Sequence, residues 1–98
     1  MTISKKVNGT SLEFALSGRI DTVTAPELEA EIFASLDGIE HLILDFSEIA
    51  YISSAGLRVL LAAQKRMKER GDMKLTNVNE SVMEIFEVTG FNEILCIE

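Results

Sequence analysis

The segment His41 to Phe46 contains three consecutive apolar residues, Leu42, Ile43 and Leu44, with no polar residue between them. Such a run indicates a strand in the middle of a sheet, covered on both faces, rather than an edge strand with one solvated face. Farther along the chain, apolar residues recur at helical spacing over 57–67. A buried strand followed by a short loop, 47–53, and then a helix predicts an α/β architecture.

The N-terminal residues predict a hairpin. Ile3, Lys5 and Val7 alternate with polar neighbours, and Leu12, Phe14 and Leu16 place one apolar face on a second strand. Between these segments lies Asn8-Gly9, a residue pair that readily takes positive φ in a tight turn. We therefore expect the first two strands to pair antiparallel.

Three helices are predicted from their boundary residues. Thr24 and Glu27 have the spacing of a capping box, which places the first helix over 24–37. The second helix is expected over 54–70, with Ser54 as its N-cap, and the third begins after Asn79. With strands at 73–78 and 94–97, residues 1–98 are expected to form a single α/β domain, in which three or more α-helices flank a mixed β-sheet of four to five strands.

Charge and composition exclude several classes of function. The 98 residues include 9 Lys and Arg and 16 Asp and Glu, a net charge of −7, which argues against nucleic-acid partners because these are bound largely through basic side chains. The chain has one His and one Cys, too few to build a zinc site from the usual donors, and we expect no metal and no other cofactor. No secretory signal and no apolar run of about 18 residues is present, so we expect a cytoplasmic protein that does not insert into a membrane.

Motifs for catalysis are missing as well. Gly-x-Ser-x-Gly, Gly-x-Gly-x-x-Gly and the Walker phosphate loop do not occur. His41 is expected at a strand edge and Cys96 as a small buried hydrophobe, and neither receives a function. We therefore do not expect an enzyme.

Small residues crowd the loop before the second helix, Tyr51-Ile52-Ser53-Ser54-Ala55-Gly56-Leu57. They leave the turn open to an approaching molecule, and the unpaired amides and positive dipole of the helix lie next to Ser54. A serine before a helix is most often only a cap. The wider pattern adds to this interpretation, because five segments occur in order: Gly-Arg-Ile-Asp at 18–21, Thr-Ala-Pro-Glu-Leu at 24–28, Leu-Asp-Phe-Ser at 44–47, Tyr-Ile-Ser-Ser-Ala-Gly-Leu-Arg-Val-Leu-Leu at 51–61 and Val-Thr-Gly-Phe at 88–91.

Together these segments resemble the STAS-domain anti-sigma factor antagonists of bacteria. The resemblance implies a STAS-like fold and a protein that binds an anti-sigma factor, itself a serine kinase, so that the sigma factor is released to act in transcription. It further implies phosphorylation of Ser54, with Ser53 as the alternative, which switches the protein off, and a phosphatase that reverses the modification. The implied partner-binding residues are Asp21, Thr22, Ser53, Ser54, Ala55, Gly56, Leu57 and Arg58.

Ser53 stands where the family motif usually has Asp, so one carboxylate beside the phosphorylated hydroxyl is missing. This departure keeps a second function open. Related STAS domains serve as scaffolds or ligand-binding modules in signalling and transport complexes without a serine switch.

Overall fold

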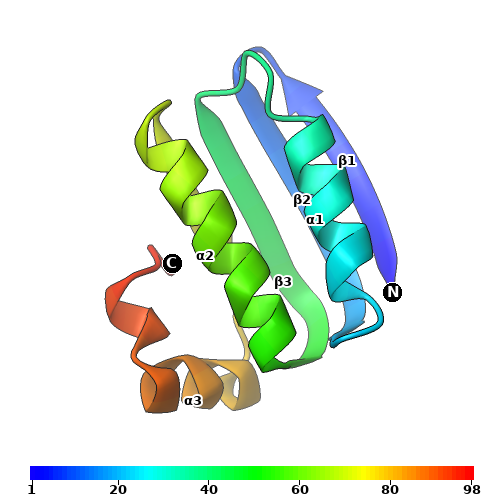
Figure 1. Cartoon of the computed structure of the whole chain (residues 1–98), viewed down its shortest axis with the longest axis vertical. Coiled ribbons are helices and arrows are strands. Elements are labelled where there is room, and N and C mark those ends of the chain that lie inside the picture. Colours follow the sequence, from blue (N-terminus) through cyan, green and yellow to red (C-terminus); the bar gives the residue numbers. More distant parts are fainter.

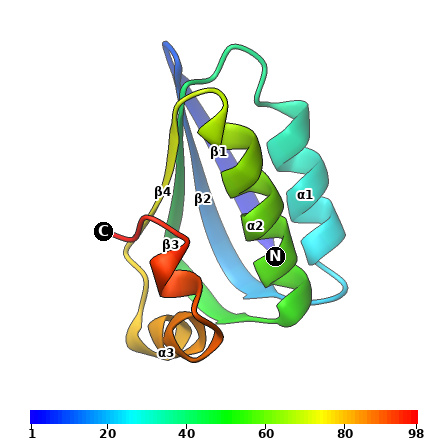
Figure 2. The same cartoon turned by 60° about the vertical axis from the view of Figure 1, so that its left-hand side comes forward.

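The computed structural model describes all 98 residues. Strand β1 pairs antiparallel with β2, while β2, β3 and β4 are parallel to one another, so the sheet is mixed and has the strand order β1-β2-β3-β4. Helices α1 and α2 lie side by side on one face of this sheet, and α3 lies across its end (Figures 1 and 2). The elements, in chain order, are β1 (Thr2–Asn8), β2 (Ser11–Ile20), α1 (Ala25–Ala34), β3 (His41–Ile52), α2 (Ser54–Lys68), β4 (Asp72–Thr76), α3 (Glu80–Thr89) and the 3-10 turn η1 (Phe91–Glu93).

The opening hairpin is confirmed. Asn8 pairs with Ser11, which leaves Gly9 and Thr10 as a two-residue turn. Gly9 has a φ of 63° and is the only one of these two residues with positive φ. Glycine at the first turn position is the residue that one type of tight hairpin requires.

The core lies on one face of the sheet only. In β3, Leu42, Leu44 and Phe46 are fully buried, whereas Ile43 and Asp45 between them are partly exposed on the opposite face. The prediction that this strand is covered on both faces was wrong, because successive side chains point to opposite faces and no helix covers the second one. The buried helix residues that complete the core include Leu28, Ile32, Leu57, Leu60, Ala63 and Met67.

Strand β3 continues to Ile52, through the segment 47–53 that we expected to be a loop. Its pairing with β2 shifts register twice, between Ala15 and Ser17 and between Gly18 and Arg19 of β2. At each shift β3 carries one extra residue, which is the pattern of a β-bulge. The bulges explain the error, because they interrupt the alternation of buried and exposed residues by which a strand is recognised in a sequence.

The first helix begins and ends differently from the expectation. The side chain of Thr24 does not cap α1; its Oγ1 donates to the carbonyl oxygen of Arg19 instead, at 2.7 Å. The predicted capping box with Glu27 therefore does not form. The helix ends at Ala34, and Gly38, with φ 77°, lies in the loop beyond it.

The C-terminal segment adds no fifth strand. Residues 94–97 make only an isolated parallel bridge, in which Ile97 pairs with Leu75 of β4. Leu95 is buried beside this bridge, whereas Cys96 is exposed, so the prediction that Cys96 is buried was wrong. None of the helices combines the length and the apolar composition that crossing a bilayer requires.

Candidate functional site at the start of α2

Two loops meet where β2 and β3 end. Ile20, the last residue of β2, pairs with Ile52, the last residue of β3, and its carbonyl oxygen accepts a hydrogen bond from the Ser53 amide at 2.8 Å. The β2–α1 loop therefore lies beside the first turn of α2. Two segments that are distant in the sequence, 21–24 and 53–58, are held together by parallel strand pairing.

The two serines of this loop have different roles. Ser53 has the extended backbone of an N-cap, with φ −95° and ψ 177°, and its side chain accepts a hydrogen bond from the Gly56 amide at 3.5 Å. Ser54 is the first residue of α2 and is exposed. The prediction that Ser54 caps the helix was therefore wrong by one residue. The exposed hydroxyl of Ser54 is outside this capping bond and remains accessible to another molecule.

Gly56 allows α2 to start this close to the strands. A methyl group at Gly56 would lie 2.6 Å from both Ile20 Cγ2 and Ile52 Cγ1, closer than carbon atoms can approach. Gly56 and Leu57 are accordingly buried, while Ala55 is half-buried and Arg58 is exposed. Of the predicted contact residues in α2, the structure thus places Ser54, Ala55 and Arg58 at the surface and the other two beneath them.

Asp21 shapes the opposite loop. Its Oδ1 accepts hydrogen bonds from the amides of Thr24 and Val23, each at 3.0 Å, and from Thr24 Oγ1 at 3.2 Å. The backbone hydrogen bond from Thr24, followed by those from the Val23 amide and the Thr24 hydroxyl and by the positive charge of Arg19, holds the pKa of Asp21 below its ordinary value. These bonds fix the loop so that Thr22 and Val23 project into solvent, Val23 with 82% of its surface exposed.

A groove of about 250 Å³ lies between the start of α1, with the loop before it, and the start of α2. Three of the residues that the sequence predicted for the site line it, namely Thr22, Ala55 and Arg58. Asp21 does not line the groove but supports its Thr22 side. The remaining lining residues, which sequence reasoning missed, are Ala25, Pro26, Glu29 and Val59; they become neighbours only once α1 and α2 pack side by side.

A cation–π pair also flanks the site and was not predicted. The guanidinium carbon of Arg19 lies 4.5 Å from the centre of the Tyr51 ring, and both side chains are exposed. Arg19 and Tyr51 are paired residues of β2 and β3. Both residues occur in the segments that carry the family resemblance. Their pairing could not be predicted, because it depends on the register shifts that the bulges of β3 produce. No group of three or more His, Cys, Asp or Glu side chains in the structure is arranged to hold a metal ion.

Comparisons with known proteins show the family of this chain. The family model of the STAS domain matches residues 2–98. A Bordetella bronchiseptica protein, BtrV, described as an anti-sigma factor antagonist, is 38% identical over 91 residues, which are 91% of this chain and 78% of the relative.

Solved structures of two other bacterial proteins have the same fold. An anti-sigma factor antagonist from Mycobacterium paratuberculosis superposes with a TM-score of 0.88 at 25% identity, covering 98% of this chain and 83% of that one. The Bacillus cell fate determinant SpoIIAA, in its phosphorylated form, superposes with a TM-score of 0.76 at 16% identity, covering 99% of this chain and 91% of that one.

Proposed function

Because the chain belongs to the STAS domain family, we propose that it is an anti-sigma factor antagonist whose binding is switched by phosphorylation of Ser54. The relative at 38% identity supports the general role. The observation that carries the switch is the exposed Ser54 hydroxyl at the first position of α2, which a kinase can reach and which the fold does not use as a cap. In this proposal the partner, an anti-sigma factor kinase, catalyses the phosphoryl transfer, and the exchange takes place in the cytoplasm.

The chemistry of the position explains why the fold would tolerate a phosphate. A phosphoserine adds a charge of about −1.5 to −2 and three strong hydrogen-bond acceptors. At the start of a helix, unpaired amides and the positive end of the helix dipole stabilise such a group. Arg58, one turn farther along the exposed surface of α2, is at the i+4 spacing that brings two helix side chains close together. A phosphate on Ser54 would thus be stabilised within the domain.

Phosphorylation of Ser54 would instead weaken the binding of the partner. We propose that the partner binds the surface formed by Thr22, Ser54, Ala55 and Arg58, with Asp21 and Ser53 fixing the two loops and Gly56 and Leu57 supporting them from below. In such an interface a neutral Ser54 hydroxyl that is hydrogen-bonded to the partner is desolvated at far lower cost than a dianion. Each 1.4 kcal/mol of added cost weakens binding about tenfold, so a few kcal/mol releases the partner.

Ser54 is a better phosphorylation site than Ser53 for a physical reason. The Ser53 side chain is half-buried and accepts the bond that caps α2, so its modification would require the helix start to open. Ser53 can replace the Asp that the family motif usually has at this position, because Ser and Asp cap helices about equally well. The helix start is therefore kept without the carboxylate.

The test uses the anti-sigma factor kinase encoded nearest to this protein in its genome. We expect Ser54→Asp to weaken binding at least tenfold while the thermal midpoint stays near that of the wild type, and Ser54→Ala to bind and to resist phosphorylation. Mass spectrometry after incubation with ATP and the kinase should locate phosphate on Ser54, and a phosphatase should restore binding. Ser53→Ala is the matched control, which should still be phosphorylated.

Two results would contradict the proposal. Equal binding of the wild type, Ser54→Asp and a phosphorylated sample would remove the switch. Binding to a signalling or transport complex without any phosphate on the protein would favour the second function, that of a scaffold or ligand-binding module, which the Ser in place of Asp at position 53 keeps open.

A further inference from the structure

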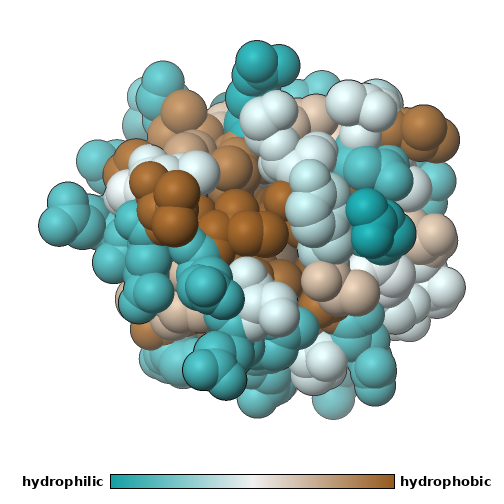
Figure 3. Space-filling view, turned by 90° about the horizontal axis from the view of Figure 1, so that it is seen from below, coloured by the Kyte–Doolittle hydropathy of each residue, from teal (hydrophilic) through white to brown (hydrophobic).

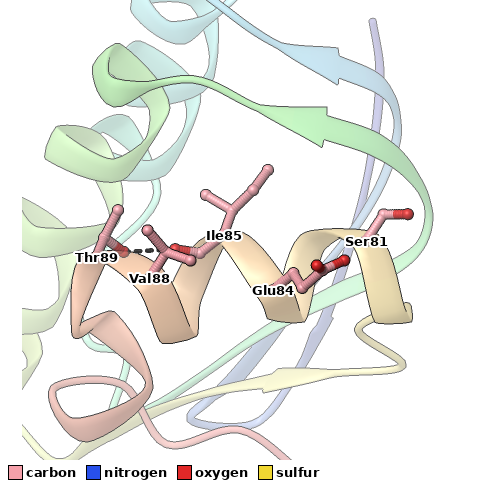
Figure 4. Close-up of a pocket in the computed structure, with 5 residues that line it drawn as sticks. All are labelled: Ser81, Glu84, Ile85, Val88 and Thr89. Carbon is pink, nitrogen blue, oxygen red and sulfur yellow. Dashed lines mark hydrogen bonds between the residues drawn. The ribbon is translucent and has the colours of Figure 1, made fainter.

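Helix α3 carries an apolar surface that the proposed switch does not use. Val82 and Phe86 of this helix are buried in the core. Elsewhere on the helix, five side chains line a shallow hollow of about 370 Å³ (Figure 4). We refer to them as the α3 stripe: Ser81, Glu84, Ile85, Val88 and Thr89.

The apolar members of the α3 stripe are only partly covered within the molecule, since Ile85 packs against the core at one side and Val88 does not. Val88 has 86% of its surface exposed, and Ile85 is only half-buried. They stand three residues apart, so they lie on the same side of the helix. The hydroxyl of Thr89 donates to the carbonyl oxygen of Ile85 at 2.7 Å, so its hydrogen is not free to bond a molecule in the hollow (Figure 4). An amphipathic helix normally buries such a side, and here Val88 and part of Ile85 are open to solvent.

The ionisable side chains of α3 are all acidic. The segment 75–98 contains no Lys and no Arg. It contains five glutamates, which supply −5 of the net charge of −7: Glu80, Glu84, Glu87, Glu93 and Glu98. Three of these lie on α3, one in each successive turn. Glu98 is paired with Lys74 at 3.4 Å, whereas the three glutamates of α3 form no ion pair. An apolar strip bordered by such carboxylates is complementary to an apolar strip bordered by cations.

Helix α3 lies at the same end of the molecule as the starts of α1 and α2 (Figure 1). The view onto this end shows a hydrophobic hollow bordered by hydrophilic side chains on the side where α3 lies (Figure 3). A partner that covers the surface around Ser54 could therefore extend a further segment toward α3.

We propose that the α3 stripe is a docking surface for an amphipathic helix of a partner protein, one that carries Lys or Arg beside its apolar side chains. A helix laid into an apolar groove is a recurring mode of protein recognition. A second copy of this chain is a poor occupant, because pairing two α3 stripes face to face would bring like-charged carboxylates together. This inference does not depend on the phosphorylation of Ser54.

The experiment is an NMR titration of the full, isotope-labelled chain with a synthetic helical peptide of Leu and Lys that places Leu on one face. We expect shifts of backbone amides to concentrate in 80–89 and in η1, and to be absent with the matched peptide in which Glu replaces every Lys. Raising the salt concentration should weaken binding of the Lys peptide, since its charges face glutamates.

Matched variants separate docking on α3 from general attraction to an acidic protein. Val88→Ser should weaken peptide binding about tenfold, as expected when one buried valine is lost, whereas Val23→Ser, at a valine exposed to a similar degree, should leave it unchanged. Glu84→Gln should weaken binding, and Glu31→Gln, on the exposed surface of α1, should not.

Three outcomes would overturn the inference. The first is that the amide shifts concentrate outside 80–93, and the second is equal binding of the Lys and Glu peptides. The third is a concentration-dependent dimer, measured by sedimentation, that Val88→Ser dissociates, because a second copy would then be the occupant.

Discussion

At the scale of single residues, the two neighbouring serines between β3 and α2 have separate roles: Ser53 caps the helix, and Ser54 offers an exposed hydroxyl. The helix start needs an acceptor on an extended residue, and Ser53 provides it. The hydroxyl of Ser54 is thereby left exposed. In the proposed switch, this division would allow a modification of Ser54 to change binding while the fold is preserved.

The division predicts different stabilities for two alanine variants. Ser53→Ala removes the side chain that accepts the Gly56 amide, so we expect it to lower the free energy of unfolding by about 0.5–1 kcal/mol. Ser54→Ala should change it by less than about 0.5 kcal/mol, as is usual at exposed positions. Denaturant unfolding of both variants checks this, and equal losses would mean that the two serines share the cap.

Asp45 predicts a dependence of stability on pH. Its Oδ1 accepts the Ser47 amide at 2.9 Å and Asn77 Nδ2 at 3.1 Å, and these bonds, the Ser47 backbone first, lower the pKa of Asp45 in the folded protein. A carboxyl whose folded pKa is lowered contributes stability above its unfolded pKa of about 3.9, and this contribution is lost as the pH falls through the lower, folded value.

Asp45→Asn should therefore destabilise the protein at neutral pH and reduce the loss of stability between about pH 5 and pH 2. Denaturant midpoints measured across this range test the expectation. Glu31→Gln, which removes an exposed carboxylate on α1, serves as the control. If the stability of Asp45→Asn and the wild type falls in parallel with pH, the bonds to Asp45 are not responsible.

At the scale of elements, the position of α2 depends on close packing against the ends of β2 and β3. The bulges of β3 bring Ile52 opposite Ile20, and Gly56 lets the first turn of α2 approach both side chains. The groove beside Ser54 exists because the helix starts at this depth. A shift of the first turn would move Ser54, Ala55 and Arg58 together.

Gly56→Ala tests this packing. Its methyl group would meet Ile20 and Ile52 at 2.6 Å, and overpacking of this kind costs about 1–3 kcal/mol. Alanine gains about 1 kcal/mol over glycine in a helix, so we expect a net loss of about 1 kcal/mol in unfolding free energy. Binding of the kinase should weaken too, although no exposed side chain has changed. A variant as stable as the wild type would show that the first turn has room to move.

At the scale of the whole molecule, the central strands have many more buried contacts than the C-terminal residues. Strands β2 and β3 pair along most of their length beneath α1 and α2. The C-terminal residues are joined to the sheet by the two backbone hydrogen bonds of the Leu75–Ile97 bridge, by the ion pair of Lys74 with Glu98, and by Leu95 and Ile97 packing on the core. Few buried contacts imply local opening at low free energy.

Native-state hydrogen exchange should therefore show that amides in 94–98 exchange before those of β2 and β3. Leu95→Ala should speed exchange in that segment first, because it removes the buried side chain that anchors it. Simultaneous exchange of the C-terminal segment and the central strands would instead show that the molecule opens only as one unit.

The sequence by itself determined the order of strands and helices, the opening hairpin and the start of α3, because each follows from a local pattern or a single residue such as Gly9 or Asn79. It also identified the loop with Ser54, from small residues next to a helix start.

Only the tertiary structure decided which serine caps α2, which face of the sheet is covered and how far β3 extends. These depend on contacts between segments distant in the chain, such as Ile20 with Gly56 and Arg19 with Tyr51, and on bulges that shift the register. A local pattern carries no information about register. The register of two parallel strands is set by backbone hydrogen bonds and side-chain packing between segments that are far apart in the sequence.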